Sequence, residues 1–220
     1  MCIRDRLKPL QFSDKNDKAS INYEKICKTL DIDSNQIIKS AQKHTDIVKD
    51  ITEYTTEKFE FVDGFITNRK NIPLVTKYAD CTPIILYDKM KNVIGNVHSG
   101  WRGTLQRISA KAVKMMIEKY NCNPADIIVC IGPCIKQCHF QVEEDFIAKF
   151  KQEFGNVEKY YKTGEIVEGK QKYYFDTTNL IIDYLTEIGI NRENIFDSNI
   201  CSVCNVANIC LLYTSDAADD

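Results

Sequence analysis

The chain has 220 residues, of which 44% are hydrophobic and 27% charged, so its composition is that of a folded globular protein and excludes a disordered or fibrous chain. Its 29 basic and 31 acidic residues give a net charge of −2, which excludes a typical nucleic-acid binder, because such proteins carry an excess of Lys and Arg. No apolar stretch approaches the ~20 residues that span a bilayer, so we expect no membrane association. The length favours a single domain.

The chain contains ten cysteines, which in a small secreted protein would indicate a disulfide framework. The first residues lack the basic segment followed by an apolar segment that is typical of a secretory signal. We therefore expect a cytoplasmic protein with reduced cysteines.

The two ends differ in character from the rest of the chain. Residues 1–6 and 211–220 resemble translated sequencing-adapter read-through, although a genuine acidic tail is the alternative for the second segment. We interpret both as non-native tails on either side of one domain that spans 7–210 and is truncated at both ends.

The first half of the chain predicts one helix followed by strands. A helix over 15–30 is expected, with Asp17 as its N-cap and with one apolar face made by Ala19, Tyr23, Ile26, Cys27 and Leu30. Short apolar or alternating runs bounded by turn residues then predict strands at 37–38, 47–48, 59–66 with a break at Asp63-Gly64, 73–76, 83–87 and 92–97.

The second half alternates between helices and strands. A long helix is predicted from Gly100 to about Tyr120, because apolar residues recur on one face at helical spacing. The remaining elements are a strand at 127–131, a helix at 143–154 with an acidic first turn, a strand at 173–175, a helix at 177–188 and an extended segment at 194–203. Because several strands follow one another without a helix between them, we expect an α/β (α+β) fold, a layered sandwich of mixed β-sheets flanked by helices.

Three residues at strand ends are candidate metal ligands. His98 ends a predicted strand just before Gly100, Cys81 lies in a loop between two strands, and His44 precedes another strand. Two histidines and a cysteine are ligands that Zn²⁺ accepts, and three protein ligands with one open position are typical of catalytic zinc. The ligands are 37 and 17 residues apart, so spacing alone leaves open a buried histidine and a buried thiol.

Several ordered segments resemble the laccase-domain family, which is also called the polyphenol oxidase or multicopper-oxidoreductase-like family and, later, purine nucleoside phosphorylase. The most specific are the segment Ala79-Asp80-Cys81-Thr82-Pro83 and the segment His98-Ser99-Gly100-Trp101-Arg102-Gly103. Weaker similarity extends to the segments 63–68, 131–142, 175–179 and 201–204.

The resemblance implies a zinc ion held by His44, Cys81 and His98, although the glycine that usually follows the first histidine is Thr45 here. It also implies a purine nucleoside enzyme, a transferase and hydrolase that acts on adenosine, inosine and methylthioadenosine with phosphate and deaminates adenosine. Such an enzyme is expected to be a monomer or homodimer. Copper fits less well than zinc, because the three histidines of this chain cannot build a multicopper centre.

Four further residues have candidate roles beside the predicted metal. Asp80 either carries a proton during catalysis or orients a histidine, and Asp63 either contacts substrate or belongs to a plain turn. Arg102, at the start of a predicted helix, either binds phosphate or pairs with a carboxylate. Cys134 is expected in a substrate-binding pocket wall. The predicted catalytic residues are therefore Cys81, His98, Asp80 and Arg102, and the predicted substrate-binding residues are Asp63, Arg102 and Cys134.

The remaining cysteines give weaker signals. Cys134, Cys138 and His139 form a Cys-x₃-Cys-His run that suggests a second metal site, but we expect only a pocket wall with one or two reactive thiols there. Cys201 and Cys204 form a C-x-x-C pair, which no second such pair accompanies, so the sequence predicts only a strand end close to the site.

Three rival interpretations remain open from the sequence. One is a metal-free cysteine hydrolase in which Cys81 is the nucleophile and His98 its base. Another is a partner-binding domain that a zinc ion merely stabilises. The third is an inactive fragment.

Overall fold

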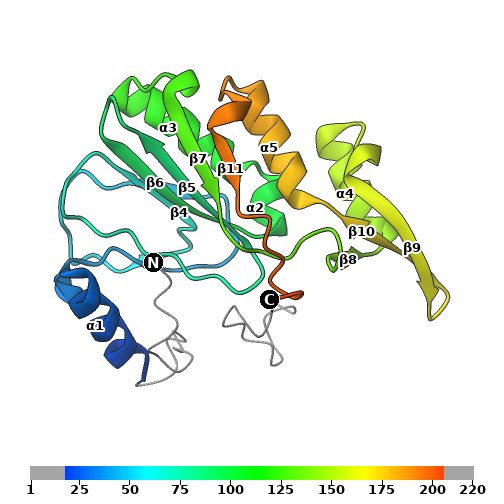
Figure 1. The fold of residues 1–220 in the computed structure, drawn as a ribbon, viewed down its shortest axis with the longest axis horizontal. Helices are drawn as coiled ribbons and strands as arrows, with labels where there is room; N and C mark the ends of the chain where they lie inside the picture. The colour runs from blue at the N-terminus through cyan, green and yellow to red at the C-terminus, as the bar shows by residue number, and fades with distance from the viewer. Residues whose placement is uncertain (1–17, 206–220) are drawn as a thin grey trace.

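A six-stranded mixed sheet forms the centre of the protein (Figure 1). The computed structural model describes residues 18–205, so Asp17 and both predicted tails lie outside the described residues. The strand order is β11-β7-β5-β6-β4-β2, in which β11 is parallel to β7, β2 is parallel to β4 and the other neighbours are antiparallel. The strands span Val48–Asp50 (β2), Gly64–Thr67 (β4), Thr82–Asp88 (β5), Val93–Ser99 (β6), Ile127–Ile131 (β7) and Ile195–Asp197 (β11).

Helices cover one face of this sheet (Figure 1). They are α2 (Trp101–Leu105), α3 (Ile108–Tyr120) and α5 (Thr177–Glu187). Side chains alternate across the sheet, so Ile84 and Leu86 of β5 are fully buried against the helices, whereas Ile85 and Tyr87 on the other face are exposed. The main core therefore lies between the sheet and α3.

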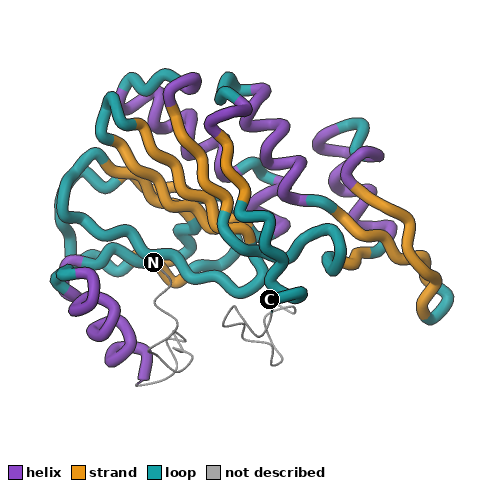
Figure 2. The backbone as a smooth tube through the Cα atoms, in the orientation of Figure 1, coloured by secondary structure: helices purple, strands orange, loops and turns teal. Residues whose placement is uncertain are grey.

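Two smaller sheets flank the central one (Figure 2). The first is the antiparallel sheet β8-β10-β9, with strands Gln141–Val142 (β8), Tyr161–Val167 (β9) and Lys170–Phe175 (β10). Helix α4 (Glu144–Phe154) packs on it through aromatic rings, since the Phe150 and Phe175 ring centroids are 4.8 Å apart. The second is the parallel pair Ser40–Ala41 (β1) and Phe59–Glu60 (β3), near helix α1 (Lys18–Leu30).

The layered α+β class is confirmed, as are most of the predicted elements. The strands predicted at 83–87, 92–97 and 127–131 and the helices predicted at 143–154 and 177–188 form with shifts of one or two residues at their ends. Helix α5 begins where Asp176 accepts a hydrogen bond from the Asn179 backbone N–H, 2.9 Å away, which caps an otherwise unpaired donor.

The single helix predicted over 100–120 is wrong, because two helices form instead. Arg107, between them, adopts a left-handed backbone with φ of 57°. Its guanidinium lies over the Phe154 ring, 4.3 Å from the centroid, and pairs with Glu153 at 3.4 Å. Contacts with α4 thus accompany the break, and helical spacing within the segment does not report them.

Other local predictions are also wrong. The strands expected at 37–38 and 73–76 reduce to one bridge between Ile38 and Leu74. In the segment 194–203, which was expected to be extended, residues 195–197 form β11 and a turn begins at Ser202. Leu30, expected on the buried face of the first helix, is 52% exposed. The sequence also missed β9, whose side chains are mostly exposed and therefore show no apolar alternation.

Candidate metal and active site

The candidate site lies where β5 begins and β6 ends. These strands are antiparallel, and their register pairs Pro83 with His98 and Thr82 with Ser99. Cys81, immediately before β5, is therefore brought beside His98 and Gly100. The sheet pairing explains how two segments of the sequence reach one place.

His44 enters the site on a loop that the Asp63 carboxylate organises. The backbone N–H groups of Lys43, His44 and Thr45 all donate to this carboxylate, over 3.3, 3.1 and 2.9 Å. The Thr45 hydroxyl donates to it as well, over 2.8 Å. Three consecutive N–H groups can converge in this way because His44 has a left-handed backbone, with φ of 57°. Asp63 thus fixes the loop that carries His44.

Asp63 also orients His98. Its Oδ1 atom is 2.8 Å from His98 Nδ1, and the two side chains are 0% and 4% exposed. A carboxylate accepts, so we assign the proton to Nδ1, which leaves Nε2 as the ligand atom. Burial alone would raise the pKa of Asp63, but hydrogen bonds from His98 and Thr45 outweigh it and hold this pKa below its usual range.

The predicted ligands His44, Cys81 and His98 come together. Their ligand atoms all lie within 4.8 Å of one another, and the two imidazole rings meet edge to face with centroids 5.0 Å apart. Gly100 leaves room for them, since a Cβ there would lie 2.6 Å from His44 Cδ2 and 3.2 Å from Cys81 Sγ. Two imidazoles, a thiol and a carboxylate behind one imidazole are a donor set that fits zinc.

Burial, together with the nearby carboxylates Asp80 and Asp63, raises the pKa of the Cys81 thiol to about 12. Without a cation beside it, this cysteine is therefore a neutral thiol at pH 7. A bound metal ion favours the thiolate, because it supplies the positive charge that the site otherwise lacks.

Asp80 connects the site to the end of the described chain. Its carboxylate accepts a hydrogen bond from Ser202 Oγ over 2.6 Å, and its backbone carbonyl accepts one from the Ile135 N–H over 2.9 Å. Asp80 thus has a defined position next to Cys81. Ser202 was not predicted as a site residue, since nothing in its local sequence distinguishes it from an ordinary turn residue.

The other predicted site residues differ in exposure. Arg102 lies exposed in α2 with its guanidinium over the Trp101 ring, 4.7 Å from the centroid. Cys134 is fully buried, with its Sγ 3.6 Å from Thr178 Oγ1. Asp63 is fully buried and accepts hydrogen bonds on both oxygens, so substrate contact by Asp63 or Cys134 has no exposed atom to support it.

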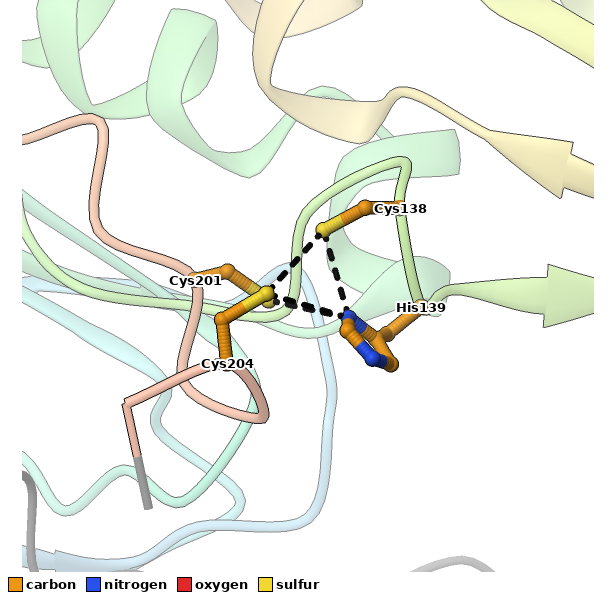
Figure 3. Close-up of side chains that lie close together, drawn as sticks. All are labelled: Cys138, His139, Cys201 and Cys204. Carbon is orange, nitrogen blue, oxygen red and sulfur yellow. Dashed lines mark hydrogen bonds between the residues drawn. The ribbon is translucent and has the colours of Figure 1, made fainter. Parts of the chain in front are cut away.

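The structure corrects the interpretation of the remaining cysteines. Cys201 and Cys204 were predicted only to lie at a strand end close to the site, and they meet Cys138 and His139 in a second group of potential metal ligands (Figure 3). The two pairs are far apart in sequence, so no local spacing could have joined them.

An α+β fold with a His-Cys-His cluster at a strand end defines a class of candidate metalloenzyme. The family model described as multi-copper polyphenol oxidoreductase laccase matches residues 9–209, and the chain belongs to this family. The resemblance seen in the sequence is thus confirmed. Within residues 18–205, no helix has both the length and the apolar character that crossing a bilayer requires.

Curated relatives include a protein named purine nucleoside phosphorylase from Borreliella burgdorferi, 31% identical over 78% of this chain and 71% of its own length. Purine nucleoside phosphorylase YlmD from Bacillus subtilis is 33% identical over 61% of this chain and 51% of its own length. Purine nucleoside phosphorylase CA_C1699 from Clostridium acetobutylicum is 33% identical over 74% of this chain and 64% of its own length. The chain thus spans between half and about 70% of these three relatives.

Solved structures of the same fold are known. The hypothetical protein YfiH of Bacillus licheniformis superimposes with a TM-score of 0.77 at 28% identity, over 86% of this chain and 72% of its own. YlmD from Geobacillus stearothermophilus gives a TM-score of 0.80 at 22% identity, over 90% and 76%, respectively, and this likeness supports the fold alone.

Proposed function

We propose that this protein is a zinc-dependent purine nucleoside phosphorylase that also deaminates adenosine. Its substrates are adenosine, inosine and methylthioadenosine, with phosphate as the co-substrate of the cleavage reaction. The observation that carries the proposal is the convergence of His44, Cys81 and His98 around Gly100, with Asp63 behind them. The names of the curated relatives supply the substrate class.

Zinc bound in an open three-ligand site supplies a Lewis acid and a water molecule with a pKa of about 7. The protein's own residues position the ligands for this metal ion. Asp63 holds the His98 imidazole in one tautomer and fixes the backbone of the loop that carries His44, both without metal. We assign Asp63 as a positioning residue, because its buried oxygens are already engaged.

Asp80 is the carboxylate that we assign to proton transfer in deamination. Two observations support this assignment. Asp80 directly precedes Cys81, and Ser202 Oγ donates to one of its carboxylate oxygens over 2.6 Å. The other oxygen has the chemistry to accept a proton from an attacking water. Its sequence neighbour Cys81 keeps it within the site.

Arg102 is the residue that we assign to phosphate. It lies exposed two residues after Gly100, on the helix that begins at the site. A guanidinium presents several N–H donors in one plane, which suits phosphate oxygens. In phosphorolysis, a phosphate oxygen bonds to C1′ of the ribose while the bond from C1′ to the purine nitrogen breaks.

A metal-free cysteine hydrolase is a weaker alternative. A nucleophilic cysteine needs an accessible thiolate, whereas burial raises the pKa of Cys81 to about 12. The Nδ1 atom of His98 is also already engaged by Asp63. A multicopper oxidase is disfavoured too, because only three histidines are present in the sequence and His139 lies in the second cluster.

Product analysis tests this function. Zinc-loaded protein is incubated with adenosine in phosphate buffer and in a phosphate-free buffer, and the products are separated by chromatography. We expect adenine and ribose 1-phosphate only with phosphate, and ammonia in both buffers. Inosine should accumulate without phosphate and should be cleaved in part to hypoxanthine with phosphate. Absence of all these products from zinc-loaded, folded protein would overturn the proposal.

The Arg102→Gln variant separates phosphate binding from the rest of the site. We expect KM for phosphate to rise by about tenfold or more, which corresponds to the ~1.4 kcal/mol or more that a charge-assisted hydrogen bond contributes. Deamination should stay within about twofold of wild type, since it needs no phosphate. Equal losses in both reactions would contradict the assignment.

A further inference from the structure

A second group of metal-ligand side chains lies apart from the candidate active site. Cys138 and His139 come from the turn before β8, and Cys201 and Cys204 come from the segment after β11. Figure 3 shows the four side chains pointing toward one another from these two segments. Their ligand atoms all lie within 4.8 Å of one another.

The distances match a tetrahedral zinc site. With Zn–S of about 2.3 Å and Zn–N of about 2.0 Å, a regular tetrahedron has S–S edges of about 3.8 Å and S–N edges of about 3.5 Å. The Cys138 and Cys204 sulfurs are 3.7 Å apart. His139 Nδ1 is 3.2 Å from the sulfur of Cys138, 3.4 Å from that of Cys204 and 3.6 Å from that of Cys201.

The backbone holds both segments in place without a metal ion. The Cys134 N–H donates to the Ile200 carbonyl over 3.2 Å, and the Ser202 N–H donates to the Cys134 carbonyl over 2.9 Å. The turn that carries His139 is closed by its own N–H, which donates to the Lys136 carbonyl over 2.9 Å. Two segments distant in sequence therefore present their ligands together by ordinary chain pairing.

Three cysteine sulfurs and one imidazole nitrogen packed this closely are the donor set of a structural zinc site. Cys138, His139 and Cys204 are exposed, which leaves an entry path for an ion.

We propose that Cys138, His139, Cys201 and Cys204 bind a second, structural zinc ion in a closed Cys₃His site. Four protein ligands fill a tetrahedral coordination sphere, so no position remains for water or substrate, in contrast to the three-ligand site at Cys81. Nothing in this assignment depends on the nucleoside chemistry proposed above.

The role of this zinc follows from what the two segments carry. Ser202, between the two cysteine ligands, donates to Asp80 over 2.6 Å. Joining the segments therefore fixes residues 201–204 against the loop that holds Cys81. Loss of the second zinc should loosen this hydrogen bond and lower the thermal stability of the whole chain.

Zinc content of the full chain tests the proposal, measured by mass spectrometry on protein purified under reducing conditions. We expect the Cys204→Ser variant to hold about one zinc per chain less than wild type. The control Cys130→Ser removes an exposed thiol of β7 outside both clusters and should hold as much as wild type. The double variant with Cys81→Ala and Cys204→Ser should lose the sum of the zinc that the two single variants lose.

Two further measurements distinguish the loss of a zinc ligand from general misfolding. His139→Cys supplies a fourth thiolate and should retain the second zinc, so retention there together with loss in Cys204→Ser excludes general misfolding as the cause. Cobalt-loaded Cys81→Ala protein should show thiolate charge-transfer absorption that Cys204→Ser abolishes in the same background.

Three outcomes would overturn the proposal. The first is equal zinc content in wild type and Cys204→Ser. The second is iron in place of zinc in this cluster. The third is a disulfide between Cys138 and Cys204, found by peptide mapping of protein that was never exposed to an oxidant.

Discussion

Replacing Asp63 with asparagine is expected to lower the free energy of unfolding by about 3–5 kcal/mol, because several buried hydrogen-bond donors lose the carboxylate that they share. Oδ1 accepts from His98 and His44, and Oδ2 accepts from Lys43 and Thr45. Whichever of the two oxygens is replaced by the asparagine NH₂ group, at least two of these hydrogen-bond donors then face another donor. Zinc affinity should fall by about 10- to 100-fold, since His98 is no longer held by a carboxylate.

Urea denaturation and zinc titration measure both effects. The control is Asp88→Asn at the far end of β5, where the carboxyl is also buried but Oδ2 has no hydrogen-bond partner. We expect that control to leave zinc affinity unchanged. Unchanged zinc affinity in folded Asp63→Asn protein would contradict the positioning role of Asp63.

The same carboxylate predicts a pH dependence of stability. Its pKa is lower in the folded protein than in the unfolded chain, where it is about 3.9. Its contribution is therefore complete at neutral pH and is lost as the pH falls through the folded-state pKa. The stability difference between wild type and Asp63→Asn should accordingly shrink in acid, and a difference that stays constant down to acid pH would contradict this account.

The second large effect is expected for Gly100→Ala, which should reduce kcat/KM by about 100-fold while changing stability little. The backbone of Gly100 has φ of −71° and ψ of 175°, which alanine adopts without strain. The new Cβ would lie 2.6 Å from His44 Cδ2, so the imidazole has to leave its position. The substitution therefore displaces a metal ligand and leaves the fold intact.

Gly164→Ala on β9 is the matched control. Its Cβ also meets a side chain closely, at 2.8 Å from the edge of the Tyr174 ring, but outside the site. Zinc titration, turnover and thermal melting are measured on both variants. Wild-type zinc affinity in Gly100→Ala would show that His44 is not a ligand.

The sequence predicted best what short-range patterns determine. Strand β5 alternates buried and exposed residues, and α5 has a capping aspartate followed by an apolar stripe, so both were found. The break at Arg107 was not predictable, because its left-handed backbone accompanies contacts with Glu153 and Phe154 on another helix. Such tertiary contacts leave no trace in the local spacing of apolar residues.

The same distinction applies to the site. His44, Cys81 and His98 were found through the family resemblance, and the structure brings them together. Asp63 looked like a turn residue, since Asp-Gly is a common turn pair, and its carboxylate is seen to organise the site only once residues 43–45 lie beside it. The second cluster escaped prediction for the same reason.

The most direct measurement for the central claim is zinc content and adenosine turnover of wild type and Cys81→Ala, measured on the same preparations. The account predicts that the variant loses about one zinc per chain together with all formation of adenine and inosine, while the zinc at Cys138 and Cys204 is retained. Turnover by protein that has lost the Cys81 zinc would contradict it, and so would a Cys81→Ala variant with wild-type zinc content and activity.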